Sequence, residues 1–180
     1  MDVDADRQRA LDAVVAALDM PAEGLKVTMV TDAGTDDLRF FEVEDVDADE
    51  HGPGRVYAIG ALVGPERTPE LARERLVDLT VRALGASGSA RTMARTFALL
   101  ESADEPVLPI LEPGDTAYLL PEWLMHVTMP AVETAADGSR VYSFWLTSGV
   151  IPLWRVVLTV APDGSHDLDA TEIDELVDDG

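Results

Sequence analysis

The chain has 180 residues, an apolar content of 47% and a formal net charge of −22. Its length and apolar content exclude a disordered chain and predict a globular protein with a substantial core. The large excess of acidic residues argues against nucleic acids and anionic membranes as partners, because phosphate groups are bound by lysine and arginine.

The first predicted element is a helix over residues 4–19. Leu11, Val15 and Leu18 recur at i, i+4 and i+7 and predict its buried face. Pro21 ends the helix. Three strands follow, and the last of them is apolar on both faces, which is typical of a central strand. The strands span residues 25–31, 38–44 and 55–63, with an acidic loop at 45–54.

Two helices are predicted in the middle of the chain. Thr68-Pro69-Glu70 has the composition of a helix start, with threonine as the N-cap and proline in the first turn, and Gly85 ends this helix. The next helix spans residues 89–102, where apolar residues again recur at i, i+4 and i+7. A proline-rich connector covers residues 103–121.

The clearest strand pattern lies in residues 123–161 and predicts a three-stranded antiparallel meander. Asp137-Gly138 is typical of a two-residue hairpin turn, and the alternation of faces then requires a three-residue loop, Ser148–Val150, at the second reversal. A capping box at residues 169–172 predicts a last short helix. The predicted core face consists of Trp123, Met125, Val127, Met129, Tyr142, Phe144, Leu146, Trp154, Val156, Leu158 and Val160.

Together these elements predict an α+β fold of two α-βββ-α halves, with antiparallel meanders, helices packed on one side and an internal duplication. A shift of 100 residues places Val27-Thr28-Met29 over Val127-Thr128-Met129 and gives eleven identities in 35 positions. Chance similarity between two unrelated halves is the alternative, because alanine and valine are frequent. The halves are expected at residues 1–85 and 86–180, either as two domains or as one compact pseudo-twofold domain.

The face of the meanders opposite the core carries the candidate binding residues. Under the 100-residue shift, both halves place a basic residue, a threonine and an arginine there, which is unexpected in so acidic a chain. This pattern indicates a site for an anionic ligand or an acidic peptide, with Trp145 as an aromatic contact. Alternatively, these are ordinary solvated or helix-covered positions. The candidates are Lys26, Arg55, His126, Thr128, Ser143, Trp145 and Arg155.

Motifs for catalysis, metals and phosphate are incomplete. His126 is the only histidine in a predicted strand, and no serine or threonine is spaced from it as in a known triad motif. The acidic runs at 45–49 and 163–167 lack the glycine of a calcium loop, and the three histidines are dispersed. Residues 85–89 lack the lysine of a P-loop. We therefore expect no cofactor and no metal.

Cysteine is absent, which excludes disulfides and thiolate chemistry. The chain has no apolar run long enough for a transmembrane helix, and its acidic start does not resemble a secretory signal, so we expect a cytoplasmic protein. The acidity fits a salt-rich cytoplasm, a GC-rich genome or the masking of a basic partner.

The order α-βββ-α resembles that of double-stranded-RNA-binding domains, although the acidity is opposite to what those domains need at phosphates. It also resembles the front part of type III secretion chaperone-like domains, which are small and acidic and hold partner proteins. The second resemblance implies a protein-holding function.

We therefore predict a non-catalytic, acidic cytosolic adaptor or chaperone-like protein that engages another protein or peptide, with a basic partner as one option. The alternative is a small-molecule-binding or hydrolytic domain with a site between the halves near His126, Trp145 and Arg155. The oligomeric state is left open.

Overall fold

The computed structural model describes seven stretches of the chain, and in the strand that begins at Arg55 it describes side chains only from residue 58 onward. The stretches are residues 3–19, 21–31, 33–46, 55–102, 106–117, 119–148 and 152–173. They form helices and two antiparallel sheets, so the predicted α+β fold with antiparallel meanders is confirmed. None of the described helices has the length and apolarity needed to cross a membrane.

The first sheet, sheet A, is a meander in which each strand pairs with the next one along the chain. Its order is β1-β2-β3-β4, so β3 has neighbours on both sides, as predicted, and β1 and β4 are the edges. The elements of this half are α1 (Val3–Leu18), β1 (Leu25–Met29), β2 (Leu38–Asp45), β3 (Arg55–Val63), β4 (Thr68–Glu70) and α2 (Arg73–Leu84).

The second sheet, sheet B, is arranged around β7. One side of β7 pairs with β8, and the other side pairs with two short strands in succession, β6 and then β5. The outer strand beyond β8 is β9. The elements of this half are α3 (Ala90–Glu101), β5 (Leu108–Ile110), the 3-10 helix η1 (Pro113–Thr116), α4 (Pro121–Leu124), β6 (Ala131–Thr134), β7 (Arg140–Thr147), β8 (Leu153–Val160) and β9 (His166–Glu172).

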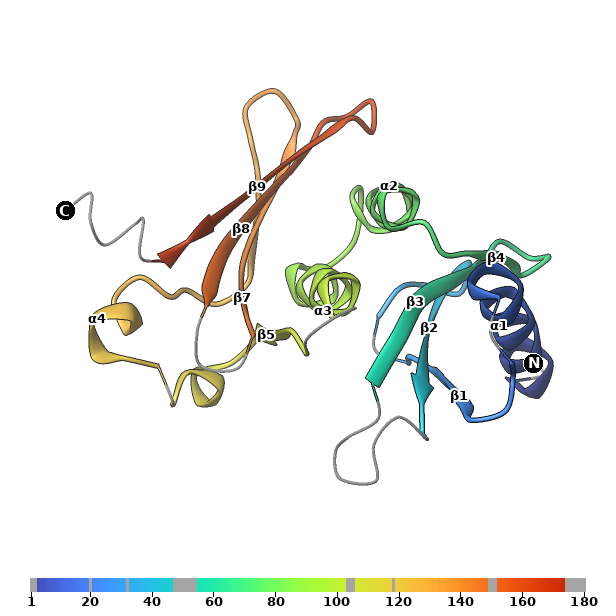
Figure 1. The fold of residues 1–180 in the computed structure, drawn as a ribbon. Helices are drawn as coiled ribbons and strands as arrows, with labels where there is room; N and C mark the ends of the chain where they lie inside the picture. The colour runs from blue at the N-terminus through green and yellow to red at the C-terminus, as the bar shows by residue number, and fades with distance from the viewer. Residues whose placement is uncertain are drawn as a thin grey trace.

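Helices α2 and α3 lie between the two sheets, and α1 covers the far face of sheet A (Figure 1). On β2, Phe40 packs toward α2 and α3, whereas Phe41 packs toward α1. On β3, Ala61 and Leu62 divide in the same way, because successive side chains of a strand point to opposite faces. Sheet A is therefore buried on both faces, which explains the apolar residues on both faces of β3.

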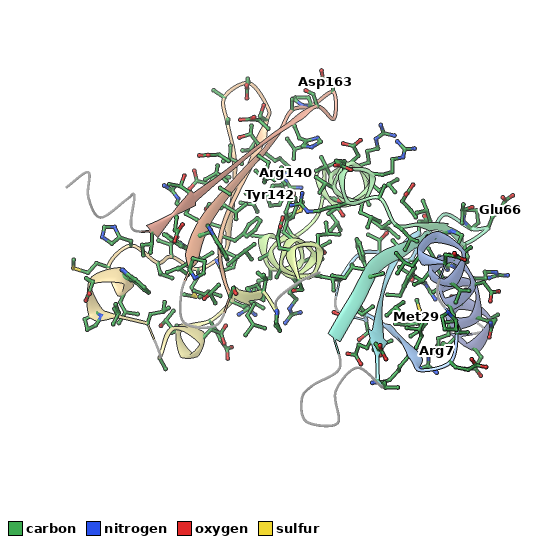
Figure 2. All side chains as sticks on the ribbon, in the orientation of Figure 1. Arg7, Met29, Glu66, Arg140, Tyr142 and Asp163 are labelled. Atoms are coloured by element: carbon green, nitrogen blue, oxygen red, sulfur yellow. The ribbon has the colours of Figure 1, made fainter. Side chains whose placement is uncertain are left out.

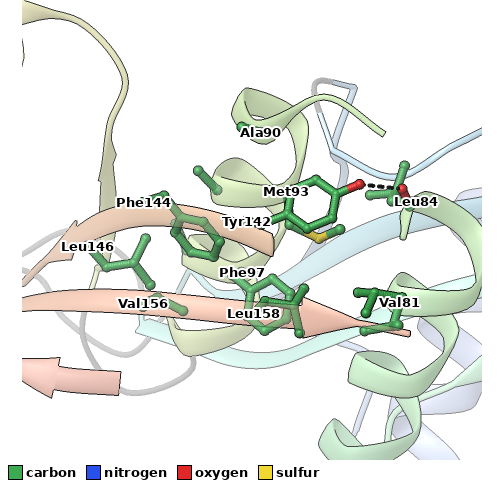
Figure 3. Packing of buried hydrophobic residues seen from close by; sticks show 13 residues of the cluster. Val81, Leu84, Ala90, Met93, Phe97, Tyr142, Phe144, Leu146, Val156 and Leu158 are labelled. Carbon is green, nitrogen blue, oxygen red and sulfur yellow. Dashed lines mark hydrogen bonds between the residues drawn. The ribbon is translucent and has the colours of Figure 1, made fainter. Parts of the chain in front are cut away.

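Sheet B turns one face toward α3, and this is the predicted core face of the meander. Tyr142, Phe144, Val156 and Leu158 pack there with Phe97 of α3 in one buried cluster (Figure 3). The rings of Phe97 and Phe144 are tilted by 50° with centroids 5.7 Å apart. The core residues predicted on β7 and β8 are confirmed.

The connector between α3 and β6 covers part of the opposite face of sheet B. Trp145 and Leu153 pack there with Ile110 of β5, Trp123 of α4 and Ile173. This second cluster explains why the residues before β6 are apolar although they do not form a strand.

The first strand predicted for the meander, residues 123–129, is wrong. Pro121–Leu124 form α4 instead, where proline fits the first turn, and Met125 is 82% exposed rather than in the core. The strand that pairs with β7 is β6, and its Val132 packs against the core cluster below sheet B. The alternating pattern was misleading because Val127 and Met129 pack on sheet B from a segment of irregular backbone, which does not pair as a strand.

The turn between β6 and β7 has three residues rather than the predicted two. The backbone N–H of Ala135 donates to the Ser139 carbonyl at 2.8 Å, and Gly138 has a φ of 87°, the left-handed conformation that ends such a loop. The Ser139 N–H donates to Asp137 Oδ1 at 2.9 Å, which lowers the pKa of the Asp137 carboxyl. The pairing of β6 with β7 is accordingly shifted by one residue from the predicted register.

The turn between β8 and β9 repeats this arrangement at Asp163-Gly164-Ser165. Gly164 has a φ of 85°, and the Ala161 N–H donates to the Ser165 carbonyl at 2.9 Å. The Ser165 hydroxyl and N–H both donate to Asp163 Oδ1, at 2.6 and 2.9 Å, and lower the pKa of that carboxyl. The acidic run at 163–167 therefore begins in a hairpin turn and ends in β9.

The loop between β7 and β8 is longer than predicted. Thr147 pairs with Leu153, so residues 148–152 make the connection, in place of the predicted three-residue loop. Both lengths are odd, and the side chains of β7 and β8 consequently keep the faces assigned from the sequence.

Two of the predicted helix starts are also wrong. Thr68–Glu70 form β4, which pairs with Ala61–Val63, and α2 begins only at Arg73 after an N-cap without a side-chain bond. Long-range pairing with β3 outweighs the local helix signal there. Residues 169–172 belong to β9, and the rest of the predicted last helix, from residue 174, lies outside the described residues, as does the acidic loop at 47–54.

Helix α1 is confirmed, but it is rotated from the predicted orientation. Its buried stripe is Asp6, Ala10 and Val14, and Leu18 is 43% exposed. The buried Asp6 carboxylate accepts a hydrogen bond from Arg9 Nη1 at 3.3 Å, and Arg39 of β2 and Arg67 of the turn between β3 and β4 also reach it. A charged residue can therefore occupy the inner face because its partners lie there too.

In the first half α1 is followed by the meander β1–β4, whereas in the second half β5, η1 and α4 come between α3 and the meander β6–β9. The 100-residue shift places β1 on residues 125–129, which are irregular. The second strands of the two meanders, β2 and β7, begin at Leu38 and Arg140. The third strands, β3 and β8, begin at Arg55 and Leu153. Internal duplication stays a prediction.

Candidate functional site

Trp145 and Arg155 are the two predicted site residues that the structure brings directly together. They are cross-strand partners on β7 and β8, so their side chains lie on the same face. Arg155 is exposed, but Trp145 is only 2% exposed because the connector covers it. The expectation that Trp145 contacts a ligand from an open sheet face is wrong. Ser143, two residues along β7, is half-buried.

His126 and Thr128 lie in irregular chain after α4 and not on a strand. Both are exposed, since they flank residues that pack on sheet B. The prediction that they share a sheet face with Arg155 is wrong, because β6 begins only at Ala131. The alternative hydrolytic or small-molecule site near His126 stays a prediction without a supporting contact.

Lys26 lies on β1 and is exposed, with its Nζ 3.3 Å from Glu44 Oε2 on the neighbouring strand. Arg55 begins β3, and its side chain is outside the described part of the structure. The six candidates with described side chains are spread over both sheets and the connector. They do not line a common cavity among those found in the described residues.

A groove of about 630 Å³ lies at the junction of the two halves. One wall is the end of β1, the opposite wall is β5 with its flanking residues, and the floor is one side of α3. We call it the junction groove. It is lined by Thr28, Met29, Val30, Thr31, Ala33, Glu42, Arg95, Ala98, Leu99, Ser102, Val107, Leu108, Pro109, Leu111 and Asp115.

The hydrogen bonds of two polar side chains in the junction groove hold its walls in place. Ser102 Oγ donates to the Ala98 carbonyl at 2.7 Å and accepts from the Val107 N–H at 2.9 Å. Asp115 Oδ2 accepts from the Leu111 N–H at 2.8 Å and from the next N–H along the chain. Ser102 thus fastens the residue before β5 to the end of α3, with its hydroxyl proton donated to a backbone carbonyl, and Asp115 holds the chain that follows β5.

A second cavity, of about 530 Å³, lies on the other face of sheet A, beside α1. Met29 of β1, labelled in Figure 2, lines both cavities, as do Val30, Thr31 and Ala33. We call this cavity the α1-side pocket. It is lined by Val3, Asp6, Met29, Val30, Thr31, Ala33, Gly34, Thr35, Asp36 and Arg39.

The charges of the α1-side pocket differ in how strongly they are engaged. Arg39, 17% exposed at its side chain, donates from Nη1 to Asp6 Oδ2 at 3.4 Å. The Asp36 side chain is fully exposed, with Oδ1 3.7 Å from Arg39 Nη2. Asp36 is therefore the acidic group that this pocket presents to an incoming molecule.

Metal binding has no support in the described residues, which contain no cluster of three or more histidine, cysteine, aspartate or glutamate side chains able to hold an ion. Part of the acidic run at 45–49 lies outside those residues.

Comparison with protein-family models, curated proteins and solved structures finds no match for the chain. Its function is therefore inferred from the geometry of the molecule.

The sequence patterns missed the junction groove because its residues come from β1, α3 and the connector, three segments that read separately as a strand, a core helix and a linker. One local signal was present: residues 25–29 form a strand with a single charge and no proline. Natural edge strands usually carry several charged residues or a proline, which hinder pairing with another strand, and residues 25–29 have only Lys26.

Proposed function

We propose that the protein is a non-catalytic binding module that holds an extended segment of another protein or peptide in the junction groove. The volume of the groove is within the range typical of ligand sites. Its apolar wall supports this proposal, since Leu108 is 56% exposed beside Val107 and Leu111, where a partner side chain would bury it. A cytoplasmic location stays a prediction from the sequence.

The use of the polar groups in the groove favours binding over catalysis. A serine nucleophile gives its proton to a neighbouring base, whereas the Ser102 hydroxyl donates its proton to the Ala98 backbone carbonyl. Asp115 caps the chain around η1 in the same way. The groove thus offers a partner a concave apolar surface and the end of strand β1, which are features of a binding site.

The test compares a variant that fills the groove with a matched variant elsewhere. Thr28→Trp places a large ring in the groove from a strand position that tolerates aromatics, and Thr134→Trp makes the same change at an exposed position of β6. Immobilised wild-type protein and both variants are incubated with native lysate, and bound proteins and metabolites are identified by mass spectrometry. A protein partner should be retained by wild type and Thr134→Trp and lost by Thr28→Trp.

Retention of the same proteins by Thr28→Trp would place their binding elsewhere and end the proposal. Enrichment of a metabolite without any protein, abolished by Thr28→Trp, would favour a small-molecule site instead.

A further inference from the structure

The backbone of β1 presents hydrogen-bonding groups to an open edge. The Val30 N–H donates to the Phe40 carbonyl at 2.9 Å, and the Val46 N–H donates to the Gly24 carbonyl at 2.8 Å. The register between these pairs is unbroken, so the even-numbered residues of β1 bond to β2. Val27 and Met29 therefore point their N–H and C=O groups away from β2, on a side where no described strand pairs.

The two large cavities lie on opposite faces of sheet A at this same stretch of edge. Thr28 and Val30 share the face of Glu42 and Phe40, which borders the junction groove. Met29 faces α1, beside the α1-side pocket. Side chains of a strand added to β1 would alternate between these two faces, so each cavity would receive every second residue.

The other sheet edges carry features that prevent strand addition. Strands β4 and β5 have three residues each and contain Pro69 and Pro109. Strand β6, which shares one side of β7 with β5, has four residues, one of them Glu133. Strand β9 is exposed and carries Asp167 and Asp169. Short length, proline and charge are the usual protections of an edge, and β1 has only Lys26, which is paired with Glu44.

Charge selects the kind of partner. The groove and the pocket together are lined by four acidic side chains and two arginines, and the whole chain carries −22. A second copy of the chain would bring the same negative charge to the edge, whereas a cationic segment would be attracted. The apolar wall of the groove requires an uncharged side chain on its side of that segment.

We infer that β1 is a docking strand for an extended segment in which apolar and basic residues alternate. Its backbone pairs with Val27 and Met29, its apolar side chains enter the junction groove, and its basic side chains lie over the α1-side pocket near Asp36. This inference rests on the proposed function and adds the mode of binding and the chemistry of the partner.

The probe is a fluorescein-labelled peptide of about nine residues in which lysine and valine alternate, long enough to pass the five residues of β1 at both ends. Binding is followed by fluorescence anisotropy. Met29→Pro removes the outward N–H without removing a bond to β2 and should weaken binding about tenfold. Met29→Leu keeps that N–H and changes only the side chain, so it should lose much less affinity than Met29→Pro does. Asp36→Asn should weaken binding about threefold at low salt.

Amide exchange of the wild-type protein gives a second readout that needs no variant. The peptide should slow exchange at Val27 and Met29, while Thr28, already bonded to β2, serves as the internal reference. A peptide of alternating serine and valine should give weaker binding and less protection.

Several outcomes overturn the inference. The peptide could lose binding to Thr28→Trp but bind Met29→Pro as tightly as wild type, with unchanged amide exchange at Val27 and Met29. That result would support binding in the groove and show that the peptide does not pair with β1. Equal affinity for the serine–valine peptide would show that basic side chains are not recognised. If the lysine–valine peptide does not bind, the proposed partner, with alternating apolar and basic residues, is wrong. Wild-type dimers in sedimentation that disappear in Met29→Pro would make a second copy the occupant.

Discussion

Sheet A is buried on both faces and open along β1, whereas sheet B is partly exposed on one face and protected at its edges. Phe40 and Phe41 point to two helical layers in sheet A, while exposed Arg155 shares the outer face of sheet B with the covered Trp145. The difference separates two roles: burial of faces supplies stability, and the unprotected edge supplies a place for a partner.

The largest expected effect concerns the helices between the sheets, and it tests whether the halves are separate domains. Phe97 packs on sheet B and Leu100 on sheet A, although both belong to α3. Phe97→Ala and Leu100→Ala should each lower the free energy of unfolding by about 3 to 4 kcal/mol, because each leaves a cavity. All three tryptophans lie in the second half, so their fluorescence follows sheet B and its connector, while far-UV circular dichroism follows both sheets.

Denaturant curves from the two signals should coincide in wild type and in both variants, as for one cooperative unit. Leu124→Ala, at a 43% exposed position, is the control and should change stability by less than about 0.5 kcal/mol. The denaturant curves could instead show two separate transitions, with Leu100→Ala shifting only the transition seen by circular dichroism and not by fluorescence. That result would establish two independent domains with a boundary near residue 85.

The second effect tests how α1 is fastened to sheet A. Asp6 has a side chain only 6% exposed and contacts Arg9, Arg39 and Arg67. Asp6→Asn should lower the free energy of unfolding by about 2 kcal/mol, because three half-buried or exposed guanidinium groups lose a common anion. Thermal unfolding by circular dichroism measures the loss.

Asp4→Asn on the same helix provides the matched control, since the Asp4 side chain is 92% exposed and, among the residues that the structure describes, forms its ion pair with Arg7. Similar destabilisation by the two substitutions would mean that general helix charge, rather than the buried contact, explains the result.

The sequence predicted β2, β3, α3 and the core faces of β7 and β8 because their patterns are local and strongly periodic. It assigned the wrong face to α1, since a charged Asp6 is placed outward by any hydrophobicity rule unless Arg39 and Arg67, far along the chain, are known to meet it. Turn length was equally hidden, because Asp137-Gly138 suits a two-residue turn as well as the last two positions of a three-residue one. The candidate site could not be predicted, as the junction groove exists only where β1, α3 and β5 meet.

The smallest effect tests the hydrogen bonds that join sheet B to the end of α2. They hold a helix to sheet B as the Asp6 contacts hold α1 to sheet A. The Tyr142 hydroxyl donates at the end of α2 and in the turn after it, with the Gly85 and Gly88 carbonyls at 2.9 and 3.3 Å and the Leu84 carbonyl at 3.2 Å, the contact drawn in Figure 3. Burial raises the pKa of Tyr142 above its ordinary 10.0, although nearby Arg140 opposes the shift. Tyr142→Phe should cost about 1 kcal/mol at pH 7.

The pH dependence of this cost identifies the buried hydroxyl as its cause. The folded protein keeps the Tyr142 proton at a pH where the unfolded chain has lost it, so the stabilisation is complete below pH 10 and decreases as the pH rises further. The difference in the free energy of unfolding between wild type and Tyr142→Phe, measured by urea denaturation, should therefore stay constant up to about pH 10 and shrink as the pH rises further. Other groups that titrate in this higher range cancel in the difference. A gap that stays constant across it would mean that the hydroxyl is accessible to water, and that sheet B is held to α2 and α3 by apolar packing alone.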